Sequence, residues 1–141
     1  MKRLVFCMLI LGFLSGCATT ADVMQDKDQG KSIVYPVTFD QSWTIAMTVL
    51  RWEGADAIEE HKGQRYMVTG SGMNLVTYGS VMGVWIDPTP YGQMKVTVVT
   101  KRRVQTNVFT TLTESTFHKR FAKAVQIVEA GKPLPSIPPE L

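Results

Sequence analysis

Two runs of alternating apolar residues flank a proline-rich loop, and this pair constrains the fold more than any other feature. The runs cover 79–87 and 93–104, and 88–92 between them reads Pro-Thr-Pro-Tyr-Gly. A period of two is typical of β-strands, and the loop composition favours a chain reversal. The first run is predicted to place Val81, Gly83 and Trp85 on one face and Met82, Val84 and Ile86 on the other. In the second run, Met94, Val96 and Val98 alternate with Lys95, Thr97 and Val99.

Three shorter β-rich runs complete a predicted antiparallel sheet with one buried face. They cover 33–37, 55–61 and 64–71, and Lys62-Gly63 between the last two predicts a tight turn. Pro36 has no N–H to donate, so the first strand is predicted to lie at an edge or to end there.

A first amphipathic helix is predicted between the opening strand and the rest of the sheet. Thr38 and Gln41 have the spacing of a capping box, and the helix is expected to run to about Glu53. Gly54 is the expected stop. One continuous apolar face carries Phe39, Trp43, Ala46, Met47 and Leu50.

A second helix is predicted from about Leu112 to Ala130, with Gly131 as its stop and a second capping box at Thr111 and Glu114. Its apolar face carries Phe117, Phe121, Ala124, Val125 and Val128, whereas His118, Lys119, Arg120 and Lys123 lie largely off that face. The proline-rich segment 132–141 is predicted to be an extended or mobile tail.

The element order is therefore β-α-β-β-β-β-α, which predicts the α+β class. We expect a two-layer sandwich, in which an antiparallel sheet of four to five strands carries two helices on one face.

The chain offers little catalytic chemistry. His61 and His118 have no second histidine or cysteine at ligand spacing, and both are interpreted as surface residues. Glu59 and Glu60 are adjacent in a strand, so their carboxylates point to opposite faces. The serines near glycines lack a G-x-S-x-G elbow. We therefore predict no catalytic residue, no metal site, no cofactor and no enzymatic activity.

Four glycines are interpreted as relieving crowding at bends or letting a helix approach the sheet closely. They are Gly70, Gly72, Gly79 and Gly83.

Two stretches are candidate contact sites. Residues 72–78, with Leu75 and Tyr78, form either a longer strand pair, a loop that folds over the core, or an exposed apolar loop that touches membrane or a partner. Lys101-Arg102-Arg103 is either a basic strand end near anionic head groups or a device for solubility and edge protection.

The N-terminus has the pattern of an export signal. Lys2 and Arg3 precede an eleven-residue apolar run from Leu4 to Leu14. As a helix this run would span roughly 16 Å, about half of a bilayer core, which is too short for a permanent transmembrane helix and typical of a signal peptide.

Leu14-Ser15-Gly16-Cys17 resembles the lipobox of bacterial lipoproteins. The resemblance implies cleavage between Gly16 and Cys17 and a lipid anchor on Cys17. Two or three acyl chains give stable anchoring. Ala18, in place of an aspartate, implies sorting to the outer membrane. An ordinary signal peptide cut near Ala18 is the alternative.

The predicted organisation is a lipoprotein signal peptide over 1–16, a lipidated flexible tether over 17–31, the sandwich domain over 32–131 and the tail over 132–141. The fourteen residues that follow Cys17, 18–31, would have an r.m.s. span of roughly 20 Å. Without the leader the chain has only one more basic than acidic residue, so we expect no nucleic-acid partner.

The element order over about 32–130 resembles the β-α-β-meander-α domains of small bacterial lipoproteins of unknown function. The Phe39–Trp43 helix start, the Gly63 turn, the meander and the final helix carry this likeness. A looser likeness is to the helix-grip domains of a lipoprotein subunit of the β-barrel assembly machinery. Neither likeness implies a functional residue.

We therefore expect a non-catalytic, lipid-anchored module that binds or scaffolds a partner at the periplasmic face of the outer membrane. Its expected partners are the membrane, through acylated Cys17, and an envelope protein. The alternative is a structural subunit of an envelope assembly or transport complex.

Overall fold

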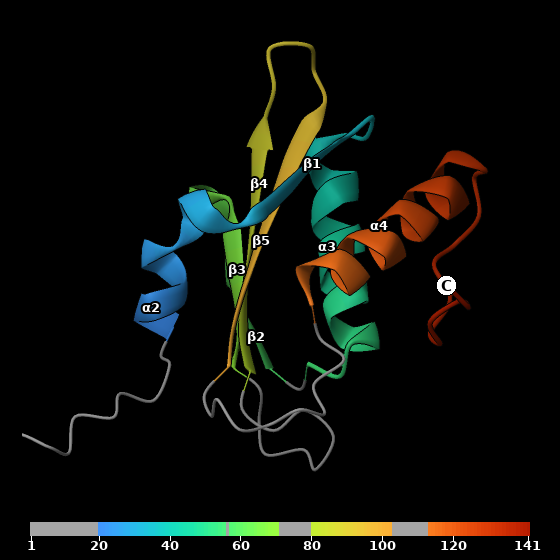
Figure 1. Cartoon of the computed structure of the whole chain (residues 1–141). Helices are drawn as coiled ribbons and strands as arrows, with labels where there is room; N and C mark the ends of the chain where they lie inside the picture. Colours follow the sequence, from blue (N-terminus) through green and yellow to red (C-terminus); the bar gives the residue numbers. More distant parts are fainter. Residues whose placement is uncertain (1–19, 56, 71–79, 103–112) are drawn as a thin grey trace, which may run out of the picture.

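The computed structural model describes residues 20–55, 57–70, 80–102 and 113–141. These residues form a five-stranded antiparallel sheet, in the order β1-β5-β4-β3-β2, and three α-helices (Figure 1). The elements in chain order are α2 (Thr20–Gln25), the 3-10 helix η1 (Lys27–Gln29), β1 (Lys31–Tyr35), α3 (Phe39–Trp52), β2 (Ala57–His61), the 3-10 helix η2 (Lys62–Gln64), β3 (Tyr66–Gly70), β4 (Ser80–Pro88), β5 (Met94–Arg102) and α4 (Glu114–Glu129). The predicted α+β class and antiparallel sheet are confirmed.

The β4–β5 hairpin is the centre of the sheet, and its alternation is confirmed. Val84 pairs with Val98, and the register continues to Pro88 opposite Met94. The even-numbered side chains of both strands enter the main core, and they are Met82, Val84, Ile86, Met94, Val96 and Val98. Val81, Trp85 and Val99 point to the opposite face, as the alternation requires.

The two edge strands are β1 and β2. β1 ends at Tyr35, one residue before Pro36, so the edge position predicted from the proline is confirmed. The predicted turn at Lys62-Gly63 is the 3-10 helix η2, and Arg65 after it has a left-handed backbone with φ of 62°.

α3 and α4 cover the main-core face of the sheet. Trp43, Ile45 and Val49 of α3 pack with Phe117 and Phe121 of α4 in one buried cluster with the strands. The indole Nε1 of Trp43 also donates a hydrogen bond to Glu60 Oε2 over 2.8 Å. The apolar faces predicted for both helices therefore point into the core.

The capping signals at α3 act as predicted. The Thr38 backbone N–H donates to Gln41 Oε1 over 2.9 Å, and the Gln41 N–H donates to Thr38 Oγ1 over 3.2 Å. Gly54 follows the helix with φ of 87°, a conformation that costs glycine little.

The predicted start of α4 is wrong. The N-cap is Thr113, whose Oγ1 accepts from the Thr116 N–H over 3.1 Å, and Thr111 lies outside the described residues. Glu114 is the first helical residue and its carboxylate accepts from the Thr100 N–H over 2.8 Å, which ties α4 to β5. At the other end Gly131, with φ of 69°, stops the helix as predicted.

The tether predicted over 17–31 is wrong from Thr20 onward. Residues 20–30 form α2 and η1 and lie on the sheet face opposite α3 and α4 (Figure 1). Val23 is fully buried in a second cluster with Val68, Val81, Trp85 and Val99. A six-residue helix with one buried apolar contact has no sustained period, so the sequence pattern resembled a linker. The predicted two-layer arrangement omitted this element, and the second face of the sheet is partly buried too.

Gly83 lets α2 approach the sheet, in agreement with the interpretation of the glycines. A Cβ built at Gly83 would lie 2.5 Å from Val23 Cγ1 and 2.6 Å from the Trp85 ring. Real Cβ atoms do not approach other atoms so closely, so a side chain here would displace α2 or Trp85.

The C-terminal tail is extended, as predicted, but it is held against the helices. Trp52 Nε1 donates a hydrogen bond to the Pro135 carbonyl oxygen over 3.1 Å, and Leu134 packs against the main core. The tail therefore forms a wall beside α3 and α4.

Candidate functional site

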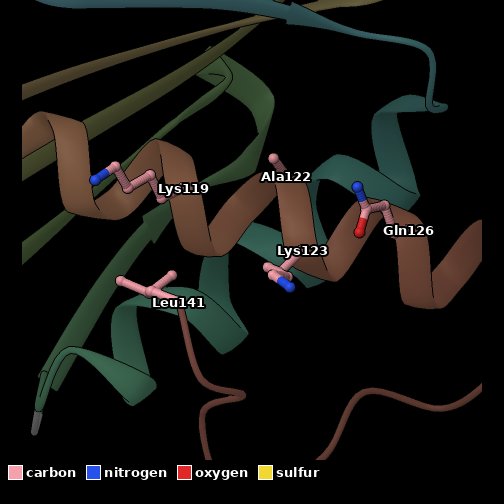
Figure 2. A pocket seen from close by; sticks show the side chains of 5 residues that line it. All are labelled: Lys119, Ala122, Lys123, Gln126 and Leu141. Carbon is pink, nitrogen blue, oxygen red and sulfur yellow. The ribbon is translucent and has the colours of Figure 1, made fainter.

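A groove of about 370 Å³ lies between α4 and the C-terminal tail (Figure 2). It is lined by Lys119, Ala122, Lys123, Gln126 and Leu141. Lys119 and Lys123 are one helical turn apart, so their side chains leave α4 on the same side. Among the described residues neither lysine makes an ion pair, whereas Lys27, Lys62 and Lys101 each contact an aspartate.

The lining of the groove combines apolar and cationic side chains. Ala122 and Leu141 are the apolar residues of its lining, and Lys119 and Lys123 are the cationic ones. A ligand with a carboxylate and a short apolar group would match both parts. The sequence placed both lysines largely off the apolar face of the helix, but the groove itself depends on how the tail docks and was missed.

A second hollow, of about 200 Å³, lies beside α2. Thr20, Ala21 and Met24 line it from α2, and Glu59, His61, Tyr66 and Val68 line it from β2 and β3. His61 Nε2 lies 2.6 Å from Glu59 Oε1, and the His61 ring stacks on Tyr66 with ring centroids 4.4 Å apart. Glu59 and Glu60 leave β2 on opposite faces, as predicted, because Glu60 contacts Trp43 in the main core.

His118 is not the surface residue that the helix pattern predicted. Its side chain is only 3% exposed. Nε2 lies 2.9 Å from the Lys31 carbonyl oxygen and Nδ1 lies 2.9 Å from Tyr35 Oη. A carbonyl only accepts, so we place the proton on Nε2, and Nδ1 accepts from the Tyr35 hydroxyl.

Burial fixes the charge state of this pair. It lowers the pKa of His118 and raises the pKa of Tyr35, so both groups are neutral near pH 7. The pair connects α4 to the edge strand β1. Its contacts are those of a structural link, with both ring nitrogens already engaged.

Glu53 and Arg120 form a second link between helices. Arg120 Nε lies 2.6 Å from Glu53 Oε1, and the glutamate side chain is only 5% exposed. Burial raises the pKa of Glu53, and the charge of Arg120 opposes that rise. This ion pair joins the C-terminal end of α3 to the middle of α4.

No family model, curated protein or solved structure matches the chain. Within the described parts of the chain, no group of three or more His, Cys, Asp or Glu side chains is placed to hold a metal ion. No helix among the same residues is long and apolar enough to cross a membrane.

Most of the residues predicted to be functional lie outside the described residues. These are Gly16 and Cys17 of the lipobox, Leu75 and Tyr78 of the apolar stretch, and Arg103. Lys101 is described near the end of β5, where its ammonium group pairs with the Asp26 carboxylate. Arg102 is the last residue of β5. The structure thus gives Lys101 a role in holding the segment after α2, which the sequence did not suggest.

Proposed function

We propose that the protein is a lipid-anchored, non-catalytic module that binds or braces a partner at the periplasmic face of the outer membrane. The observation that carries this proposal is the segment Leu14-Ser15-Gly16-Cys17, placed directly after a positive start and an eleven-residue apolar run. Acylation of Cys17 would give stable membrane attachment.

The contacts of the titratable groups support a binding role. His118 and Tyr35 engage each other and the Lys31 carbonyl, and Glu53 engages Arg120. These are the described groups whose pKa values are shifted, and each of them links one element to another. Perturbed groups that already have structural partners are poor candidates for acid–base catalysis.

The groove beside α4 is the surface that we assign to a protein partner. Its two lysines, which make no ion pair within the described parts of the chain, and its apolar lining complement an acidic segment that carries an apolar side chain. α4 and the C-terminal tail, which line the groove, lie on the opposite side of the sheet from α2 (Figure 1), so a partner in the periplasm could reach the groove while the anchor is in the membrane.

The anchor is tested by substituting the two cysteines separately in cells that make lipoproteins. Cys17→Ser should abolish incorporation of labelled fatty acid and release the domain or leave an uncleaved precursor. Cys7→Ser is the matched control, because that residue lies in the predicted leader and its loss should leave lipidation intact. A Cys17→Ser protein that is still lipid-labelled and normally cleaved would contradict the proposal.

The partner surface is tested by photo-crosslinking in native membranes. A photoreactive residue at Gln126, which lines the groove, should crosslink an envelope protein through an acidic segment. The same residue at the exposed Gln93, before β5, is the control. The crosslink should be lost when Lys119 and Lys123 are replaced by glutamate. Equal crosslinking from both positions would exclude the groove as the docking surface.

Mild detergent extraction distinguishes a structural subunit of an envelope complex from a free binding module. A structural subunit of an envelope complex should co-purify with its partners in fixed ratio. A free binding module should purify alone and gain thermal stability when its ligand is added.

A further inference from the structure

We infer that α2 clamps the lipid anchor to the sheet, so that the face of the domain bearing α2 lies against the surface of the lipid bilayer. This inference rests on the proposed function, because it requires an acyl chain on Cys17. It goes further by naming the face of the domain that meets the membrane and the element that holds it there.

The first step is that α2 is docked by several independent contacts. Val23 is fully buried between α2 and the strands, over the space left by Gly83. Lys27 Nζ contacts Asp87 Oδ2 over 2.9 Å, and Asp26 pairs with Lys101. Thus apolar contacts of Val23 and Met24, together with these two ion pairs, hold the segment 20–30 to the sheet.

The second step is the length of chain between anchor and fold. Thr20 is three residues after Cys17. Three residues span at most about 11 Å when fully extended. A free tether from Cys17 to Lys31 would have an r.m.s. span of roughly 20 Å and a limit near about 50 Å. Docking of α2 therefore restricts the domain to a short distance from the bilayer.

The hollow beside α2 shows which face of the domain is near the anchor. Thr20 lines the hollow that also contains Glu59 and His61, so these side chains are close to the anchored end of the chain. α4, which lines the groove, lies beyond the other face of the sheet (Figure 1). The short connection places the Glu59 side near the lipid head groups and the Lys123 side away from them.

Attraction between basic residues and anionic lipid is not what holds this orientation. Lys27 and Lys101, two basic residues that the structure describes beside α2, are paired with aspartates of the same domain. Their charge is therefore partly neutralised before it can meet anionic lipid. The orientation should follow from the length of the connection, and it should persist on vesicles without anionic lipid.

Energy transfer from single dye labels to the bilayer tests the inference. Cys17 is the last cysteine of the chain and its thiol is blocked once acylated, so one introduced cysteine gives a unique label. The lipidated protein, with Glu59→Cys or Lys123→Cys, is reconstituted in phosphatidylcholine vesicles that carry an acceptor dye on the head groups. We expect transfer to be more efficient from position 59 than from position 123.

Two variants that release α2 complete the test. Val23→Asp places a charge in the apolar contact, and Gly83→Ala forces a Cβ to within 2.5 Å of Val23 Cγ1. Both should remain lipid-labelled and vesicle-bound but lose the difference between the two label positions. Val23 lies outside the sheet, so Val23→Asp keeps the test open if Gly83→Ala fails to fold.

Gly63→Ala is the matched glycine control, because a Cβ at Gly63 meets nothing within 4 Å. It should keep the difference between the labels.

Equal transfer from positions 59 and 123 in the otherwise unsubstituted protein would overturn the inference. A difference that survives Val23→Asp unchanged would also overturn it, because α2 would then not set the orientation. Failure of the proposed function gives another result: the protein carries no fatty-acid label and does not bind vesicles, whichever position is labelled. That result would reject the anchor and the orientation together.

Discussion

At the scale of single residues, His118 is the group whose burial has the clearest consequence for stability. Burial lowers its pKa in the folded state below the ordinary value of 6.5, so the unfolded chain takes up a proton at higher pH than the folded protein does. The stability that neutral His118 contributes is complete above about pH 6.5 and is lost as the pH falls through the folded-state pKa. We expect the urea concentration at the unfolding midpoint to decrease when the pH is lowered from 7.5 to 5.5.

Replacing the two histidines separately assigns this pH dependence. His118→Gln should reduce the change in urea midpoint between the two pH values. His61→Gln is the comparison variant, because His61 stacks on Tyr66 beside α2 and takes no part in the contact between His118 and Tyr35. If the urea midpoint decreases as much with pH in His118→Gln as in the unsubstituted protein, His118 is not the responsible group.

Trp43 combines a buried ring with one polar contact. Its side chain is 4% exposed and its Nε1 donates to Glu60. Trp43→Ala should lower the free energy of unfolding by about 3–5 kcal/mol, because it removes a core aromatic and leaves a cavity. Trp43→Phe should cost less, since most of the ring volume remains. An unchanged melting temperature in Trp43→Ala would show that the apolar face of α3 is misplaced.

At the scale of elements, the Glu53–Arg120 pair fixes α3 against α4. Arg120→Ala would leave a nearly buried carboxylate without its cation, so we expect a loss of about 3 kcal/mol at pH 7. Without the Arg120 cation, the pKa of Glu53 in the folded protein rises further. A carboxyl group with a raised pKa in the folded state destabilises the fold when it is ionised, and this penalty is absent below the unfolded pKa of 4.5. The deficit of Arg120→Ala should therefore shrink as the pH falls toward 4.5.

Arg51→Ala is the control for that prediction. Arg51 is an exposed arginine in the last turn of α3. Its loss should cost only the modest interaction of a cation with a helix C-terminus, about 0.3–1 kcal/mol. If Arg51→Ala and Arg120→Ala destabilise the protein equally, the buried pair has no special role. Chemical denaturation at pH 7 and pH 5 measures both variants.

The accuracy of the sequence interpretation also differs from element to element, for physical reasons. α3 and the β4–β5 hairpin were predicted well because capping, period and loop chemistry are local signals. α4 was started too early because Thr111 and Glu114 have the spacing of a capping box, whereas Thr113 is the N-cap and Glu114 accepts a hydrogen bond from β5. α2 was missed because its docking depends on one buried valine, Val23, that fits over Gly83, a glycine far away in the sequence.

At the scale of the whole molecule, sites formed by one contiguous segment could be predicted from the sequence, whereas sites formed by distant segments could not. The lipobox is a contiguous motif and could be found without a structure. The groove and the link between His118 and Tyr35 join segments far apart in the chain, Tyr35 and His118 being 83 residues apart. Helix patterns place such residues on a face, but they cannot say which distant segment covers that face.

The second apolar cluster makes α2 part of the folded unit, and removing it should have a global effect. A chain that starts at Lys31 would expose Val68, Val81, Trp85 and Val99 to water on one side of the sheet. We expect a lower melting temperature and binding of a hydrophobic dye, while the core between the sheet and α3 and α4, which contains no residue of α2, stays folded. A chain that starts at Thr20 is the control and should match the full domain in both measurements. Equal melting temperatures for the two truncated chains would mean that α2 covers the sheet without stabilising it.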